Sequence, residues 1–303
     1  MYDVLIVGGG PAGLTAGIFA AKRKLSAVVL NDGEFGGQLI TAFWIENYPG
    51  MGRIEGKELA KKLVEHAREA GVVMKKEEVK MIEKRNNGFV VKTEDGEYEA
   101  KAVIIATGAK CRSIGVCGEN EYLGKGVSFS ASCDGESFRG KKVAVIGGGD
   151  SALKAALHLS GIASEVYLIH RREEFRAEEG LQAELRRSSV KLLLNKAPKE
   201  FKGDVCLRSV VIEDANTHEV SELSVDGVFV YVGSTPASSL AAKLGVEVDE
   251  RGFIKVDRNQ KTNIPGVFAA GDITGGILQV IGACGEGAVA ATRVYEYIRS
   301  RAQ

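Results

Sequence analysis

The stretch of the chain best suited to chemistry is Phe129–Gly135, which reads F-S-A-S-C-D-G. Cys133 is a thiol, and it is followed directly by an acid, Asp134, and by a glycine typical of a turn. Ser130 stands three residues earlier. With sulfur in place of its side-chain oxygen, the stretch would become C-A-S-C, a dithiol that can open and close as a disulfide. With serine at position 130 this internal disulfide cannot form, so the chemistry of the stretch rests on one thiol.

Glycine-rich signatures of nucleotide binding lie on both sides of this thiol. In the first, an apolar strand, Val4–Val7, leads into G-G-G-P-A-G, which satisfies G-x-G-x-x-G. Gly8 would make the turn, Gly10 would let backbone approach a pyrophosphate, and Gly13 would let the following helix pack on the strand. The next predicted strand, Ala27–Leu30, is followed by an acid, which in such sites holds the adenosine ribose. The predicted site comprises Gly8, Gly10, Pro11, Ala12, Gly13, Asn31 and Asp32.

The second signature follows the strand Lys142–Ile146 and reads G-G-G-D-S-A, with alanine at the third small position. The strand after it ends in H-R-R, with a further arginine four residues beyond. An NAD site has an acid here for the ribose hydroxyl, whereas guanidinium groups suit a 2′-phosphate, so the pattern predicts NADPH. A solvated basic helix start is the alternative, and His170 is interpreted as a packing or adenine-edge residue. The predicted site comprises Gly147, Gly149, Asp150, Ser151, Ala152, His170, Arg171, Arg172 and Arg176.

Three further stretches have the composition of loops that contact a ligand. The run Gly36–Leu39, G-G-Q-L, would wrap a flat ligand or form a plain surface loop. Thr107 and Gly108 follow an apolar run, which places them at the carboxyl end of a buried strand, where ligands bind in open α/β sheets. Asp272 follows another strand, Gly266–Ala270, and would either hold a ribityl or ribose hydroxyl or cap a helix.

The two halves of the chain repeat one plan, in which a strand–helix–strand unit is followed by a β-meander and a buried closing strand. The first meander covers Glu78–Ile82, Phe89–Thr93 and Tyr98–Ala106, with turns at Asn87-Gly88 and Asp95-Gly96. The second covers Val190–Leu194, Val205–Glu213 and Glu219–Ser224, and Val228–Val232 closes the unit. The length of 303 residues also favours two domains.

Composition argues against several classes of protein. Forty basic residues balance forty acidic ones, so the net charge gives no reason to expect binding to nucleic acid or to an anionic membrane. No apolar run reaches the roughly 18 residues that span a membrane, and no signal peptide is recognisable. The five cysteines are odd in number and scattered, unlike a secreted disulfide framework. We therefore expect a cytoplasmic protein, and no metal site is predicted.

Taken together, the motifs resemble the low-molecular-weight, NADPH-dependent thioredoxin reductase family. The chain contains, in the family's order and over nearly its whole length, G-G-G-P-A-G, G-G-Q-L, E-N-Y-P-G, A-T-G-A, S-C-D-G, G-G-G-D-S-A, H-R-R-E-E-F-R-A and A-A-G-D. The resemblance implies an α/β homodimer with two Rossmann-like, three-layer domains, the second inserted into the first. The FAD-binding domain would span 1–114 and 246–303, and the NADPH-binding domain 115–245. The FAD site would add to the first signature Gly36, Gly37, Gln38, Leu39, Asn47, Thr107, Gly108, Asp272, Gln279 and Val280.

The resemblance also implies a mechanism, in which electrons pass from NADPH to the flavin and then to a C-x-x-C disulfide that reduces thioredoxin. Cys133 corresponds to the thiol next to the flavin, and Asp134 to the acid that manages the proton. Ser130 occupies the position of the cysteine that attacks thioredoxin. Because the nicotinamide and the dithiol share one domain, that domain is expected to swing, with hinges near Cys111–Gly118 and Gly233–Ser238.

Three positions depart from the family's pattern. Ser130 replaces the outer cysteine, Cys117 stands where proline is usual and is interpreted as a small buried hydrophobe, and Leu278 replaces an arginine, which would alter a flavin-loop or dimer contact. Two hypotheses account for Ser130. It is a Cys→Ser change in a working thioredoxin reductase, or the chain is a flavoprotein with one redox cysteine. The latter would act as an NADPH oxidase, as a peroxide reductase through a Cys133 sulfenate, or as a reductase of an external carrier. A non-catalytic nucleotide sensor is a third class, with little support.

Overall fold

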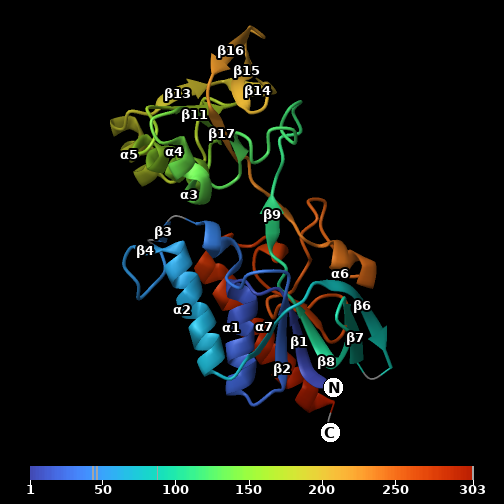
Figure 1. Cartoon of the computed structure of the whole chain (residues 1–303). Coiled ribbons are helices and arrows are strands. Elements are labelled where there is room, and N and C mark those ends of the chain that lie inside the picture. The colour runs from blue at the N-terminus through green and yellow to red at the C-terminus, as the bar shows by residue number, and fades with distance from the viewer. Residues whose placement is uncertain (43, 46, 87, 302–303) are drawn as a thin grey trace. The chain divides into compact units, whose positions relative to one another are not determined.

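The structure is a computed structural model that describes residues 1–42, 44–45, 47–86 and 88–301, with the backbone alone at Trp44 and Cys133. It divides into two compact units (Figure 1). The first unit consists of Met1–Lys110 and Thr235–Gln303, and the second of Cys111–Ser234. Three predictions fall partly outside the described residues, namely the turn at Asn87, Glu46 of the E-N-Y-P-G motif, and the side chain of Cys133.

The first unit is built on a seven-stranded sheet in the order β5-β2-β1-β8-β7-β6, with β19 also paired to β8. The pairs β5–β2, β2–β1, β1–β8 and β8–β19 are parallel, and β6–β7–β8 is the predicted antiparallel meander. The bounds are β1 (Tyr2–Val7), β2 (Ala27–Asn31), β5 (Val73–Lys76), β6 (Val79–Arg85), β7 (Gly88–Thr93), β8 (Glu97–Ile105) and β19 (Val267–Ala269).

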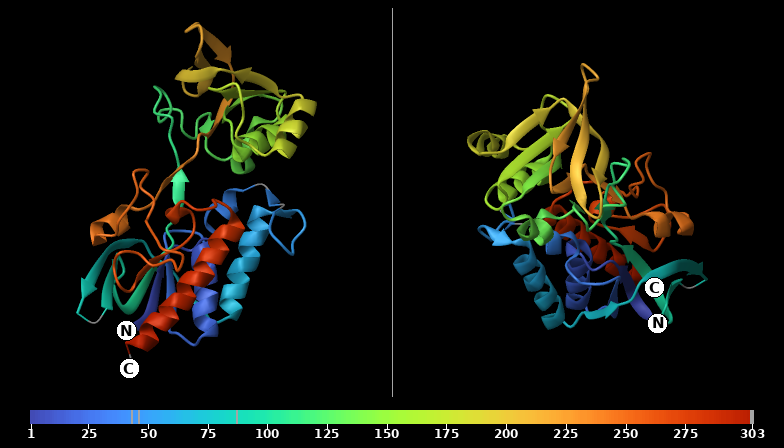
Figure 2. Two further views of the ribbon diagram at one scale, coloured as in Figure 1. Left: turned by 180° about the vertical axis from the view of Figure 1, so that it is seen from behind. Right: turned by 45° about the horizontal axis from the view of Figure 1, so that its top comes forward.

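Alternate residues of these strands enter two different cores, as the pleat of a strand requires. Val4 and Ile6 of β1 pack with the helices α1 (Pro11–Lys22), α2 (Gly56–Glu69) and α7 (Val280–Ser300). Figures 1 and 2 show these three helices side by side on one face of the sheet. Leu5 and Val7 face the other core, to which the meander and the short helix α6 (Ser239–Leu244) contribute. The unit therefore has the three layers expected of a nucleotide-binding fold.

The second unit contains a parallel five-stranded sheet in the order β10-β17-β11-β12-β13 and an antiparallel three-stranded sheet, β14-β15-β16. The two sheets share a core in which Ile146 and Val230 meet Phe201 and Ile212. The helices α3, α4 and α5 lie together beside the parallel sheet (Figure 1). The bounds are β10 (Val127–Ser128), β11 (Lys142–Gly147), β12 (Glu165–His170), β13 (Lys191–Leu194), β14 (Lys196–Gly203), β15 (Leu207–Asp214), β16 (Val220–Ser224), β17 (Gly227–Tyr231), α3 (Ala131–Asp134), α4 (Asp150–Ser160) and α5 (Glu179–Arg187).

The second meander differs from the prediction. The run predicted as Val190–Leu194 forms β13, which is the parallel edge strand and not part of the meander. The first meander strand is β14, which the sequence does not reveal because Pro198 lies inside it. The structure accommodates this proline at a register shift between Pro198 and Glu200.

The chain passes between the units twice, through β9 (Ala109–Cys111) and β18 (Ser234–Pro236), which pair as a two-stranded sheet. Along the chain, the boundaries between the compact units fall at 110/111 and 234/235, whereas the sequence predicts them at 114/115 and 245/246. The later boundary shifts because α6 packs against β6 and buries Ala241 in the first unit's core. Among the described residues, no helix combines the length and the apolar character that crossing a bilayer requires.

Candidate active site

The first glycine-rich turn joins β1 to α1 at the carboxyl end of the sheet. Gly8 has a φ of 110°, and a Cβ there would overlap the carbonyl oxygen of Ala106. A Cβ at Gly13 would overlap the carbonyl oxygen of Gly8, so helix and turn touch through backbone alone. Gly10 faces open space, with only Gly37 Cα near a built Cβ, at 3.7 Å. No described side chain caps α1, so its first amides are available to a phosphate. This cradle fits a dinucleotide.

The two residues at the end of β2, Asn31 and Asp32, have different roles. Asn31 Oδ1 accepts a hydrogen bond from the Gly9 amide (2.7 Å), and Asn31 Nδ2 donates to the Glu34 carbonyl (2.9 Å). The Asn31 side chain therefore holds the glycine-rich turn to the loop that follows β2. Asp32 is exposed, and its carboxylate is the better placed of the two for a ribose.

Long-range hydrogen bonds gather the other predicted residues of the first unit around this turn. The Gly36 amide donates to the Gly9 carbonyl (2.8 Å), and Gln38 Nε2 donates to Asp272 Oδ2 (2.8 Å). Asn47 Nδ2 donates to Gln279 Oε1 (3.1 Å), next to Val280 at the start of α7. Burial raises the pKa of Asp272, and the charge of Glu286 raises it further. Asp272 does not act as a helix cap. Gly271 occupies the N-cap position of the 3-10 turn, and the Asp272 carboxylate instead accepts the hydrogen bond from Gln38.

Three further predicted residues make contacts within the first unit itself. Thr107 Oγ1 donates to the Ala237 carbonyl (2.9 Å), and the Gly108 carbonyl accepts from the Ala237 amide (3.0 Å). These two residues fasten the end of β8 to the returning chain, which leaves their remaining backbone groups for a ligand. Leu39 is a core residue, so its side chain packs beneath the loop.

The second glycine-rich turn joins β11 to α4 in the second unit. A Cβ at Gly148 would overlap the imidazole of His170, and a built Cβ at Gly149 meets nothing within 4 Å. His170 is 7% exposed, lies 5.3 Å from the ring of Phe175 in a stacked arrangement, and donates through Nε2 to the Glu174 carbonyl (3.1 Å). Burial lowers the pKa of His170, which disfavours the protonated ring. It is a packing residue beneath an open turn that fits a second dinucleotide.

Three guanidinium groups flank this turn on the loop after β12. The Arg176 amide donates to the Gly148 carbonyl (2.8 Å), which ties the loop to the turn. Arg171, Arg172 and Arg176 are all exposed, and within the described part of the chain none of them forms an ion pair. Asp150, at the start of α4, accepts from the Glu178 amide (2.9 Å), while Ser151 and Ala152 continue the helix. Unpaired arginines beside an open glycine turn suit a phosphorylated ribose.

The thiol stretch forms the single turn α3 after β10. Ser128 Oγ donates to Asp134 Oδ2 (2.6 Å) and accepts from the Ser130 amide (2.9 Å). The Asp134 amide donates to the Ser130 carbonyl (3.0 Å), so positions 130 and 133 are one turn apart. Ser130 Oγ lies 3.2 Å from Ser132 Oγ. The backbone thus has the geometry of a C-x-x-C turn, with a hydroxyl at its outer position.

The other cysteines do not join this turn. Cys111, Cys117 and Cys206 are exposed, and Cys284 is buried. The prediction of a buried Cys117 is wrong, because its backbone bridges to Glu200 at the edge of β14 and its side chain stays at the surface. Leu278 is 45% exposed beside Ile277, which is 71% exposed, so both are apolar surface residues of the first unit.

Sequence reasoning missed three residues that organise these sites. Glu286 Oε2 accepts from the Gly271 amide and from Thr274 Oγ1, each at 2.8 Å, and so holds the loop that carries Asp272. Ser128 holds Asp134, and Tyr231 contacts the start of α3. Glu286 had a recognisable signal, since it is an acid inside an otherwise small and apolar stretch. The sequence around Ser128 and Tyr231 contains no such signal.

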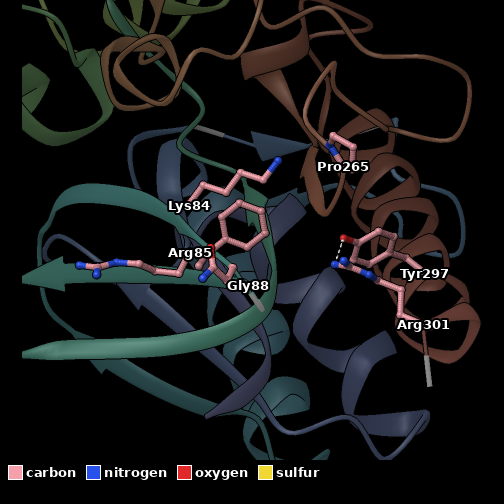
Figure 3. Close-up of a pocket in the computed structure, with 8 residues that line it drawn as sticks. Lys84, Arg85, Gly88, Pro265, Tyr297 and Arg301 are labelled. Carbon is pink, nitrogen blue, oxygen red and sulfur yellow. Dashed lines mark hydrogen bonds between the residues drawn. The ribbon is translucent and has the colours of Figure 1, made fainter.

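A separate pocket of about 360 Å³ lies in the first unit and contains none of the predicted residues (Figure 3). Arg301 donates to the hydroxyl of Tyr297 (2.8 Å) on one side of it. Phe89 pairs with Ala100, near the amino end of β8, so the pocket is at the opposite end of the sheet from the glycine-rich turn. Its remaining lining residues are Lys84, Arg85, Asn86, Gly88 and Pro265.

Comparisons with known proteins agree with this arrangement. Residues 2–287 match the family described as pyridine nucleotide-disulphide oxidoreductase. The thioredoxin reductase of Bacillus subtilis (strain 168) is 41% identical over 301 residues, covering 98% of this chain and 95% of that protein. The thioredoxin reductase structure of Lactococcus lactis is 40% identical with a TM-score of 0.97, covering 99% of this chain and 100% of that one. That of T. acidophilum is 39% identical with a TM-score of 0.94, covering 97% and 98%.

The matches extend over both units and both glycine-rich turns. The chain therefore belongs to the pyridine nucleotide-disulphide oxidoreductase family, whose thioredoxin reductase members use FAD and NADPH.

Proposed function

We propose that this protein is a thioredoxin reductase in which the first unit binds FAD and the second binds NADPH. The observation that carries the proposal is the second unit's combination of an open glycine turn, three unpaired arginines beside it and a thiol turn on the same sheet. Bound FAD would supply the two-electron step between a nicotinamide and a sulfur. The residues of the chain bind the two nucleotides, orient them and manage the proton of the thiol.

In the first unit, the amides at the start of α1 would hold the pyrophosphate and Asp32 the adenosine ribose. Asp272, fixed by Gln38 and by the loop that Glu286 anchors, would accept a hydrogen bond from the ribityl chain. Asn47 and Gln279, already bonded to each other, would close the loop over the ligand. The remaining predicted residues of this site would contribute to the turn or contact the ligand through their backbone.

In the second unit, the turn at Gly147–Gly149 would hold the pyrophosphate of NADPH. Arg171, Arg172 and Arg176 would bind the 2′-phosphate, because guanidinium groups form paired, charge-assisted hydrogen bonds with phosphate oxygens. His170 supports the turn from beneath without acting as an acid or base.

Cys133 would be the sulfur that exchanges electrons with the flavin, and Asp134 the acid that gives and takes its proton. Ser128 keeps Asp134 oriented through the bond of 2.6 Å. Ser130 is neither a soft nucleophile nor a disulfide partner, so thioredoxin reduction would be blocked at the step that needs the outer thiol. The alternative function, suggested by the same serine, is reduction of oxygen, peroxide or an external carrier through Cys133 alone.

The partners we propose are a thioredoxin-like protein and a second copy of the chain. Ile277, Leu278 and Ile281 are exposed apolar residues around the start of α7, and burial of such a surface favours a homodimer. The five cysteines are odd in number and scattered, unlike the disulfide framework of a secreted protein, which supports a cytoplasmic location.

The deciding experiment compares the protein with its Ser130→Cys variant. Both are expected to bind flavin and to lose its yellow colour with NADPH, because neither step needs residue 130. Only the cysteine variant is expected to reduce a thioredoxin in a continuous NADPH assay. If the variant fails while the serine protein consumes NADPH with oxygen or peroxide, Cys133 works alone and the thioredoxin assignment is wrong.

A further inference from the structure

The start of α3 is bonded to a side chain from a distant strand. The amide of Ala131, the first residue of the helix, donates to the hydroxyl of Tyr231 (2.9 Å), one hundred positions along the chain. Ala131 is completely buried, so water does not replace this acceptor. A buried amide that loses its partner is destabilising, and the phenol oxygen is therefore a specific anchor for the helix.

Tyr231 also contacts the nucleotide-binding turn, through its backbone. It is the last residue of β17 and pairs with Gly147, the last residue of β11. A Cβ at Gly147 would overlap the Tyr231 carbonyl oxygen, so the first glycine of the turn lies directly on this residue. One residue thus touches the turn with its main chain and the thiol helix with its side chain.

The other end of α3 is held from the neighbouring strand. Ser128, the last residue of β10, bonds Asp134 at the end of the helix and pairs with Phe229 of β17. The two strands are adjacent and parallel, so both finish at the carboxyl end of the sheet. The orientation of the single turn between these two anchors follows the sheet that carries the glycine turn.

We propose that Tyr231 is a positioning residue for the thiol. Its phenol oxygen fixes the first amide of α3 to the strand that supports the nucleotide turn, and this sets the orientation from which Cys133 reacts. The catalytic part of the inference rests on the proposed function, whereas the anchoring part concerns the second unit alone.

The anchoring is tested on the protein with Ser130 by hydrogen exchange of the peptide covering residues 129–135. Tyr231→Phe removes the hydroxyl and keeps the ring, so exchange in this peptide should become roughly tenfold faster. The matched control is Tyr167→Phe, which removes a hydroxyl bonded to Glu165 (2.6 Å) on β12, a strand of the same sheet that β11 separates from β17. The control should leave the peptide unchanged. Equal exchange in the protein and in Tyr231→Phe would overturn the proposal.

The positioning role is tested in the Ser130→Cys background. Tyr231→Phe should lower kcat for thioredoxin reduction at least about tenfold, because a small misplacement of a reacting group is costly. The KM for NADPH and the rate of flavin bleaching by NADPH should not change, which a general loosening of the unit would not reproduce. A kcat within twofold of the background, or a parallel rise in KM, contradicts positioning. If the background itself does not reduce thioredoxin, the proposed function fails, and hydrogen exchange alone decides the role of Tyr231.

Discussion

The preference for NADPH over NADH is predicted to depend on Arg172 and Arg176. The pKa of His170 is lowered chiefly by burial, and also by the positive charges of Arg172, Arg176 and Arg171, in that order. His170 lies against Gly148 of the turn, so the two arginines whose charge affects it most are natural candidates for contact with the nucleotide. We therefore choose the double variant Arg172→Ala/Arg176→Ala.

The expected magnitude follows from the hydrogen bonds between arginine and phosphate that the double variant cannot form. A hydrogen bond to a charged group contributes about 1.5–3 kcal/mol, and these exposed side chains belong at the lower end because solvent screens them. Two such bonds then amount to about 3 kcal/mol, which corresponds to roughly a hundredfold higher concentration of NADPH for half-maximal rate. NADH lacks the 2′-phosphate, so its half-maximal concentration should stay within about twofold.

The assay is anaerobic bleaching of the bound flavin in a stopped-flow instrument, with NADPH or NADH as the reductant. It needs no disulfide, so the protein with Ser130 can be used. The matched control is Arg186→Ala/Arg187→Ala, which removes two exposed arginines from the last turn of α5. Added salt should reduce the difference between the half-maximal concentrations of NADPH and NADH. The reasoning is refuted if the double variant raises the half-maximal concentration of NADPH less than threefold, or raises those of NADPH and NADH by the same factor. The arginines would then be a solvated helix start.

Two further predictions concern flavin binding and acid stability. Gly13→Ala would place a methyl group on the Gly8 carbonyl and should abolish flavin retention, measured by absorbance after gel filtration, whereas Gly285→Ala, which meets no atom within 4 Å, should retain it. Hydrogen bonds from two lysines and a tyrosine lower the pKa of Glu165 from 4.5 to about 2. The carboxylate therefore stabilises the second unit above pH 4.5, and this contribution disappears as the pH falls towards 2. Glu165→Gln should make the midpoint of thermal unfolding depend less steeply on pH over that range. An unchanged dependence on pH would contradict the pKa assignment.

The sequence was sufficient for features in which a short motif fixes its own geometry. The two glycine-rich turns, the helices after them and the first meander all lie where the pattern of small, apolar and turn residues predicts them. Each depends on contacts between residues close in the chain or on the strict requirement for glycine at a crowded turn.

The features that sequence could not supply depend on distant pairings. The bond between Ala131 and Tyr231 joins residues one hundred positions apart, and that between Gln38 and Asp272 joins residues 234 apart. Strand β14 was hidden because Pro198 argues locally against a strand, yet the pairing with β15 overrides it. The exposure of Cys117 follows from an edge position that its own neighbours in sequence do not reveal.

The packing of α1 against α7 has a consequence for the order in which the protein matures on the ribosome. Ala290, Ala291 and Val294 of α7 complete the core around α1, although nearly the whole chain separates the two helices. The second unit is continuous in sequence, so it can fold as soon as it emerges, while the first unit waits with an uncovered apolar face. A nascent chain halted before α7 would therefore hold a finished second unit and an unfinished first one, a state that chaperones recognise.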